Sequence, residues 1–239
     1  MTAAARRTGI LGGTFDPIHW GHLDVAAAAV SELKLSRLFI VTSNVPPHRP
    51  QPLASPFHRF AMVSLALLDR PNTWRAVDVE LRHEAPSFTS HTLELFHARG
   101  YLPSDLFFVI GADAFLEIAS WHDYPRILDA ANFAVVSRPG FSVKELPLRL
   151  PDLASRMARP PLDEAQREPL IILLDAPTAD VSSTAIRQRL ANREPITGLV
   201  PPPVQQHIEH HGLYSSMTPD RRGSGVTQTW TAGRLHDKE

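Results

Sequence analysis

The segment Gly12–His22 carries the residues best suited to chemistry, paired glycines followed by paired histidines. We expect Gly12 and Gly13 to adopt positive φ angles, so that main-chain N–H groups and the start of the next helix face an anion. The imidazoles of His19 and His22 can donate hydrogen bonds to the same anion. This combination suits phosphoryl or nucleotidyl transfer, which depends on positioning and charge stabilisation. The segment has neither the Gly-x-Gly-x-x-Gly spacing of dehydrogenases nor the Gly-Lys-Ser/Thr of P-loop enzymes.

A second anion-binding feature lies near the other end of the chain, at Val181–Arg187. Ser182 or Ser183 can cap a helix that starts there, and capping is the simplest explanation of these serines. Arg187 lies within the first turns of that helix and can reach an anion at its N-terminus. Two phosphate-facing helix starts that are so far apart in the chain are more specific together than either one alone.

Short apolar runs and helical stretches alternate along most of the chain, and these elements must position the two features. Most runs are continuous, as in parallel strands buried on both faces, whereas residues 77–81 alternate like a strand nearer an edge. We expect helices at 22–34, 57–69 and 89–99, and strands at 8–11, 38–42, 77–81, 106–110, 133–137 and 170–174. The alternation predicts an α/β fold with a Rossmann-like doubly wound parallel sheet. The carboxyl ends of its strands, where ligands collect, would include Gly12–His22.

The composition is that of an ordinary globular protein: 239 residues, 43% hydrophobic, 21% charged, with a formal net charge of −1. Without a basic field we expect no nucleic acid partner, and without an apolar run of about 20 residues no membrane span. The chain has no cysteine, which excludes disulfides and cysteine-ligated zinc. No secretory signal is recognisable, so we expect a cytoplasmic protein. We expect a flexible N-terminus at 1–7, one domain at 8–214 and a disordered tail at 215–239.

The two motifs resemble those of a known superfamily. His19-Trp20-Gly21-His22 resembles the His-x-Gly-His signature of nucleotidyltransferases, and Gly12–His22 resembles the opening of the bacterial nicotinate-nucleotide adenylyltransferase family. Val181–Arg187 resembles the superfamily motif Ile-Ser-Ser-Thr-x-Ile-Arg, and the resemblance as a whole runs from about Gly9 to Tyr214. It implies a Rossmann-like fold, with His19 and His22 as catalytic residues that contact ATP phosphates. The residues that it assigns to ATP are Gly12, Gly13, Thr14, Phe15, Gly111, Asp113, Ser182, Ser183 and Arg187.

Two further stretches match this family in order and spacing and concern a second substrate. The proline-rich loop contains His48 and Arg49, which the resemblance makes candidates for the phosphate of a second nucleotide. Without the resemblance, Arg49 could equally be an ordinary solvated side chain. The stretch Pro86–Leu93 opens a helix whose N–H groups near Thr89 could hold a nicotinate carboxylate. The alternative is simple capping by Ser87 or Thr89.

A third stretch supplies an aromatic and two charged candidates. Trp121 offers a flat face for a pyridine ring, although a lone tryptophan more often packs in a core. The resemblance favours stacking, and the next family residue, often aromatic, is His122 here. Asp113 follows a strand and could accept ribose hydroxyls, as acidic residues do in other doubly wound folds. Arg138 is a candidate phosphate contact.

The resemblance implies that ATP and nicotinate mononucleotide react with Mg²⁺ to give deamido-NAD and pyrophosphate, without a covalent enzyme intermediate. The sequence has no carboxylate cluster for a metal cage, so we expect phosphates and water to hold the ion. Two alternatives remain. The protein could be an adenylyltransferase for nicotinamide mononucleotide or phosphopantetheine, or a non-catalytic nucleotide-binding module. The sequence does not indicate an oligomeric state.

Overall fold

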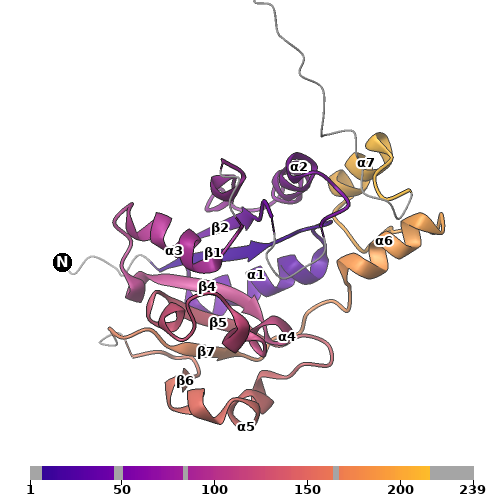
Figure 1. The fold of residues 1–239 in the computed structure, drawn as a ribbon. Coiled ribbons are helices and arrows are strands. Elements are labelled where there is room, and N and C mark those ends of the chain that lie inside the picture. Colours follow the sequence, from indigo (N-terminus) through magenta and orange to yellow (C-terminus); the bar gives the residue numbers. More distant parts are fainter. Residues whose placement is uncertain (1–6, 46–50, 83–85, 164–166, 216–239) are drawn as a thin grey trace, which may run out of the picture.

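A computed structural model describes residues 7–45, 51–82, 86–163 and 167–215, which form one sheet with helices on both faces (Figure 1). The strand order is β3-β2-β1-β4-β5-β7-β6, and every neighbouring pair is parallel. The prediction of a doubly wound parallel sheet is therefore confirmed. The strands are β1 (Thr8–Gly13), β2 (Arg37–Thr42), β3 (Trp74–Val77), β4 (Leu106–Gly111), β5 (Asn132–Val136), β6 (Met157–Ala158) and β7 (Ile171–Leu174).

Helices connect these strands and begin largely where the sequence indicates. Ser55 caps α2 by accepting a hydrogen bond from the His58 N–H, and Gly100 follows α3 with a φ of +87°. The α-helices are α1 (Trp20–Leu33), α2 (Pro56–Ala66), α3 (Thr89–His97), α4 (Ala112–Phe115), α5 (Leu146–Arg149), α6 (Ser183–Ala191) and α7 (Pro202–His211). Short 3₁₀ helices are η1 (Val79–Arg82), η2 (Pro103–Asp105), η3 (Ile118–Ser120), η4 (Arg126–Asp129), η5 (Val143–Glu145) and η6 (Pro151–Arg156).

Alternate residues of each strand pack into two separate hydrophobic cores, one on each face of the sheet. In β4, for example, Phe107 and Val109 face the core that contains α1, α2, α6 and α7, whereas Phe108 and Ile110 face the core that contains α3 and α4. Burial on both faces explains why the strands appear in the sequence as continuous apolar runs.

The strand order reverses between β1 and β4, which lie side by side at the centre of the sheet. From β1 the chain proceeds outward through β2 to β3, and then returns to β4 on the other side of β1. The carboxyl ends of strands at such a reversal form the usual ligand crevice of doubly wound sheets. Gly13 and Gly111 end these two strands, so the predicted loops begin at this crevice.

One local prediction is wrong, and one short strand was not predicted. The strand expected at 77–81 ends at Val77, and residues 79–82 form a 3₁₀ turn, in which Leu81 N donates to Asp78 O at 3.0 Å. The exposed ion pair between Asp78 and Arg82 has the spacing of a helical turn. The edge strand β6 was not predicted, because its two residues give no recognisable pattern.

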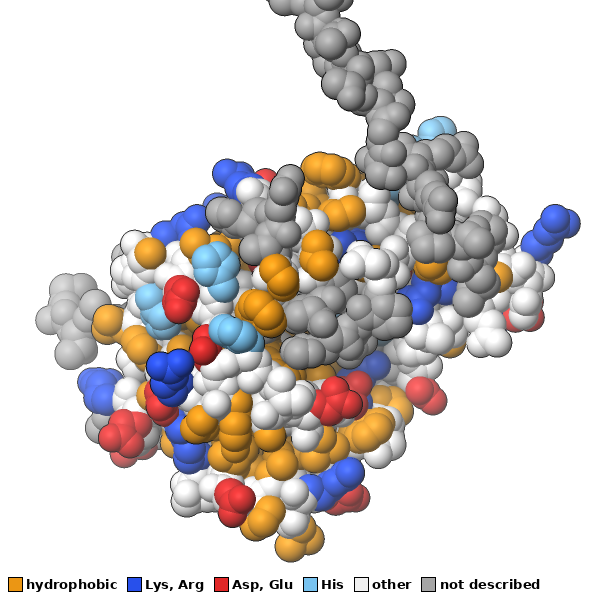
Figure 2. All heavy atoms as spheres, in the orientation of Figure 1, with side chains coloured by type: hydrophobic (Ala, Val, Ile, Leu, Met, Phe, Trp, Pro, Cys, Tyr) orange, Lys and Arg blue, Asp and Glu red, His pale blue; other side chains and the backbone are white. Residues whose placement is uncertain are grey.

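The predicted termini fall mostly outside the described residues. Of 1–7 only Arg7 is described, and its guanidinium donates a hydrogen bond to Leu33 O at 3.0 Å. Of 215–239 only Ser215 is described. Within the described ranges, no helix has the length and apolar character needed to cross a bilayer. On the face shown in Figure 2, basic and acidic side chains are interspersed.

Candidate functional site

The loop between β1 and α1 is shaped by close packing, and the prediction of positive φ at its glycines is wrong. Gly12 and Gly13 both belong to β1, and neither has a positive φ. Their lack of a Cβ is still required: a Cβ on Gly13 would lie 2.8 Å from the Phe15 ring, and one on Gly12 would lie 3.2 Å from Phe108. The left-handed residue is Phe15, with a φ of +50° and a fully buried side chain. The loop is therefore sterically fixed.

The two histidines stack on each other at the start of α1. His19 is the N-cap residue and His22 follows one turn later, with ring centroids 3.8 Å apart and planes 27° apart. The His19 N–H donates to His22 Nδ1 at 3.3 Å. Since Nδ1 of His22 acts as the acceptor, its ring proton lies on Nε2, which is a hydrogen-bond donor. The edge of His22 also contacts Phe15, with the centroids 5.1 Å apart.

His19 is buried and electrically neutral. Only 2% of its surface is exposed, and burial, followed by the nearby charge of Arg138, lowers the pKa of His19 to about 3. Its buried Nδ1 has no hydrogen-bond partner among the described residues. Buried polar atoms normally have partners, so this nitrogen is suited to complete its hydrogen bonding with a ligand.

The start of α6 packs directly against the same loop. Ser183 Oγ donates to Pro17 O at 2.9 Å, and Arg187 Nη1 donates to Asp16 O at 2.7 Å. Ser182 caps the helix by accepting from Ala185 N, as the simple explanation of the two serines predicts. Two segments more than 160 residues apart are thus joined by hydrogen bonds within four residues of His19. This is the convergence that the two motifs predict.

Arg138 completes the cationic side of this region. A Cβ on Gly21 would lie 3.0 Å from Arg138 Nη1 and 3.1 Å from Ala179 O, so the start of α1 is closely packed against both. A Cβ on Gly111 would lie 3.1 Å from Arg138 Cγ and 2.5 Å from Asp113 Oδ1. Arg138 therefore extends between the carboxyl end of β4 and the start of α1. We call the loop Gly13–His19, the starts of α1 and α6, and Arg138 the phosphate corner.

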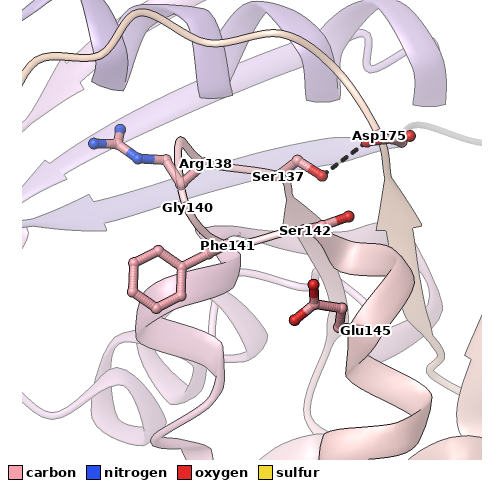
Figure 3. Close-up of a pocket in the computed structure, with 7 residues that line it drawn as sticks. All are labelled: Ser137, Arg138, Gly140, Phe141, Ser142, Glu145 and Asp175. Carbon is pink, nitrogen blue, oxygen red and sulfur yellow. Dashed lines mark hydrogen bonds between the residues drawn. The ribbon is translucent and has the colours of Figure 1, made fainter.

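A hollow of about 320 Å³ lies on the other side of Arg138 (Figure 3). Figure 3 shows the Arg138 guanidinium extending away from Glu145 and Asp175, which line this hollow. Asp175 accepts a hydrogen bond from Ser137 Oγ at 3.0 Å and pairs with Lys144 at 2.6 Å. Ser137, Lys144 and Asp175 thereby satisfy one another.

Asp16 supports the loop from within, and the sequence analysis assigned it no role. Its buried carboxylate accepts hydrogen bonds from Leu53 N, Ala54 N and the Tyr214 hydroxyl, at 2.9, 3.1 and 2.7 Å. Burial, followed by the charge of Asp16, raises the pKa of Tyr214 well above its usual range. The carboxylate thereby connects the loop to the segment before α2 and to Tyr214, which lies shortly after the end of α7. No local pattern marks Tyr214 as a partner, because 198 positions separate the two residues.

Arg59 is the second support that the sequence analysis missed. It lies on α2 and is fully buried. Its guanidinium donates to four main-chain carbonyls: Thr14 O at 2.7 Å, Ser43 O at 2.7 Å, Asn44 O at 3.1 Å and Ala54 O at 3.2 Å. A charged group is costly to bury unless it is fully hydrogen-bonded, and here the bonds hold the loops after β1 and β2 together. The sequence signal that could have identified this support is an arginine among the apolar residues of the helix predicted at 57–69.

A second region forms where three other segments meet. Val45 pairs with Pro86, and Ser87 Oγ accepts from Asn44 N at 2.8 Å. The N-cap residue of α3 is Phe88, whose side chain makes no capping hydrogen bond. The capping by Ser87 that was considered as an alternative is therefore not observed, because this hydroxyl is directed to the loop after β2. Thr89 is the first residue of α3.

Aromatic rings close this second region. His122 stacks on Phe88 with centroids 4.3 Å apart, and its Nδ1 lies 3.2 Å from Ser90 Oγ. Trp121 is partly exposed and contacts Phe108 edge-on at 6.1 Å. We call the segments 43–45, 87–90 and 121–122 the aromatic side. The predicted phosphate ligands His48 and Arg49 follow Val45 in the chain but lie outside the described residues.

The fold and the phosphate corner together are those of a nucleotidyltransferase. The cytidylyltransferase-like family matches residues 10–189 of the chain. The chain is 41% identical over 209 residues to the probable nicotinate-nucleotide adenylyltransferase of Cronobacter sakazakii, covering 85% of this chain and 93% of the relative. The corresponding Escherichia coli protein is 37% identical over 207 residues, covering 86% and 97%. The chain belongs to the nicotinate-nucleotide adenylyltransferase family.

Solved structures share the fold. The Plasmodium falciparum nicotinic acid mononucleotide adenylyltransferase in complex with NaAD has a TM-score of 0.67 and 19% identity, covering 87% of this chain and 97% of that chain. The same protein in complex with APC has a TM-score of 0.65 and 20% identity, covering 87% and 96%. The family resemblance found in the two sequence motifs is thereby confirmed, and the protein is an enzyme of the nucleotidyltransferase class.

Proposed function

We propose that the protein transfers AMP from ATP to nicotinate mononucleotide, forming deamido-NAD and pyrophosphate. The observation that carries the transfer reaction is the hydrogen bonding of the α6 start to the loop that holds His19 and His22. This arrangement brings imidazole, guanidinium and helix-start groups together at one corner of the sheet. Such donors stabilise the charge that develops on phosphate oxygens during transfer.

The reaction needs no covalent intermediate. An oxygen of the mononucleotide phosphate attacks the α-phosphorus of ATP, the bond to the bridging oxygen breaks, and pyrophosphate leaves. We assign His22 Nε2–H and the His19 ring to the phosphates at the reacting centre. Arg187 and the N–H groups of the helix start at Ser182 and Ser183 then hold the β and γ phosphates, with Gly12, Gly13, Thr14 and Phe15 forming the wall of the loop. Asp113 and Gly111 lie at the end of β4, where ribose hydroxyls would bind.

The residues present suit a magnesium ion that arrives with ATP. The buried carboxylate of the phosphate corner, Asp16, already accepts three hydrogen bonds and is not available as a ligand. Asp24, the acidic residue nearest the start of α1, accepts from Ala179 N at 2.8 Å. When bound, Mg²⁺ neutralises phosphate charge and orients the triphosphate. Phosphate oxygens and water would supply most of its ligands.

The aromatic side accounts for the choice of the second substrate. The first turn of α3 has N–H groups that its N-cap side chain does not satisfy, and they can bind the nicotinate carboxylate near Thr89. Trp121 precedes His122, which contacts the start of α3. The ring of Trp121 can therefore cover the pyridine ring of nicotinate mononucleotide. His48, Arg49 and Arg138 remain candidates for the mononucleotide phosphate.

The assay that tests this function measures pyrophosphate release from ATP and Mg²⁺ with nicotinate or nicotinamide mononucleotide. A hydrogen-bonded carboxylate is worth about 1.5–3 kcal/mol, so we expect kcat/KM for the acid to exceed that for the amide by roughly 10–100-fold. Equal kcat/KM values for the acid and the amide would contradict the proposed binding of the nicotinate carboxylate at the start of α3. Release with phosphopantetheine alone would assign the alternative substrate, and no release with any acceptor would favour a non-catalytic module.

A further inference from the structure

Three histidines outside the phosphate corner converge where α2 meets α7. His58 lies in the first turn of α2, and His207 and His211 lie one turn apart on α7. Residues at this spacing project from the same side of a helix. One ring nitrogen from each imidazole lies within 4.8 Å of the other two, and His58 Nδ1 is 3.1 Å from His207 Nε2. The three ring centroids are 4.4–5.2 Å apart.

This geometry matches a site for a d-block cation. Zinc binds imidazole nitrogens at about 2.0–2.1 Å, which places two ligands of a tetrahedral site about 3.3 Å apart. His58 Nδ1 and His207 Nε2 share a hydrogen bond at 3.1 Å, which already holds these two nitrogens close to that separation. His58 and His207 are half-buried and His211 is exposed, so two ligands are held by packing and water has access to a fourth position. Neutral imidazoles without thiolates suit Zn²⁺ and neighbouring divalent ions. Among the described residues, His58, His207 and His211 are the group of histidine and acidic side chains whose nitrogen or oxygen atoms lie close enough together to hold a metal ion.

We propose that His58, His207 and His211 bind one divalent d-block cation, with Zn²⁺ as the probe, and that this ion fastens α7 to α2. Both helices support the phosphate corner. Arg59 follows His58 directly and holds the loop carbonyls, and α7 leads to Tyr214, which donates to Asp16. The ion has a structural role and takes no part in transfer.

The test uses the full chain, freed of metal by a chelator and titrated with Zn²⁺ against a chromophoric competitor in the absence of nucleotide. We expect one Zn²⁺ per chain. At about 100 times the dissociation constant, we expect the midpoint of thermal unfolding to rise by roughly 5–10 °C. Both effects should disappear in His207→Gln and in His211→Gln. Because His211 is exposed, the second variant remains informative if the first one misfolds.

Two matched variants distinguish this site from other imidazoles. His210→Gln changes the neighbouring histidine of α7 and should retain both effects. His22→Gln removes a possible competing site in the phosphate corner and should also retain zinc binding. The proposal is overturned if wild type binds no stoichiometric zinc, if binding survives in both His207→Gln and His211→Gln, or if it is lost in His22→Gln.

Discussion

The phosphate corner and the aromatic side are built in different ways. In the phosphate corner, buried and half-buried polar groups reach across the chain: Arg187 and Tyr214 to Asp16, and Arg59 to Thr14 O. The Arg59 guanidinium also reaches Ser43 O and Asn44 O of the aromatic side. The aromatic side is held by one backbone bridge, by the hydrogen bonds from Asn44 N to Ser87 Oγ and between Ser90 and His122, and by stacked rings that are partly exposed. The difference indicates that the groups proposed to stabilise charge are held by buried, long-range hydrogen bonds, whereas the proposed surface for the second substrate consists largely of exposed rings. Catalysis by electrostatic donors requires this kind of fixed geometry.

The sharpest test of the contrast is His22→Ala, for which we expect the largest effect. Losing one preorganised donor should lower kcat by roughly 10²–10³ and leave the KM for both substrates within a few-fold. Steady-state pyrophosphate release measures both parameters. His97→Ala, which changes a histidine at the end of α3 outside both regions, should retain wild-type kcat. A His22→Ala enzyme with near wild-type kcat would contradict the role given to this imidazole.

Arg59→Met tests whether buried hydrogen bonds hold the phosphate corner. The substitution leaves four main-chain carbonyls without their donor, and we expect the free energy of unfolding to fall by roughly 3–5 kcal/mol. Urea denaturation measures the change. Arg70→Met is the matched control, because Arg70 packs against Trp20 and Trp74 without this network and should cost about 1 kcal/mol. Similar losses of unfolding free energy in Arg59→Met and Arg70→Met would mean that the hydrogen bonds of Arg59 to the loop carbonyls do not stabilise the fold.

The sequence predicted the parts of the fold and site that depend on local patterns. Continuous apolar runs marked five of the seven strands, and a cap at Ser182 or Ser183 marked the start of α6. It could not predict that Tyr214 meets Asp16 or that Arg59 meets the loops after β1 and β2, because long-range packing decides those contacts. The positive φ expected at Gly12 and Gly13 failed for a related reason: the glycines are required by the neighbouring rings of Phe108 and Phe15.

The pH dependence of stability provides a smaller test of burial in the phosphate corner. The pKa of His19 in the folded protein is about 3, against about 6.5 when unfolded, so the unfolded chain takes up a proton that the folded protein does not. Stability therefore falls as the pH decreases through the window between these values. From about pH 7 to about pH 5, wild type should lose about 2 kcal/mol more than His19→Asn. If urea titrations show the same loss of unfolding free energy in wild type and in His19→Asn, His19 is not buried as described.

Trp121→Leu tests the aromatic side, where we expect the smallest effect. Replacing the aromatic face removes about 0.5–1.5 kcal/mol of ring stacking and should raise the KM for nicotinate mononucleotide by roughly three- to tenfold. The KM for ATP should stay within about twofold. Initial rates with each substrate varied in turn measure the two constants. Equal increases in both would mean that Trp121 serves the fold and not the second substrate.

The most direct measurement is a crystal structure of the protein with a non-hydrolysable ATP analogue and Mg²⁺. We predict that the triphosphate lies in the phosphate corner, with His22 Nε2 and the Arg187 guanidinium each within about 3 Å of phosphate oxygens of the same molecule. A triphosphate that contacts one of these groups and leaves the other facing a separate space would contradict the account.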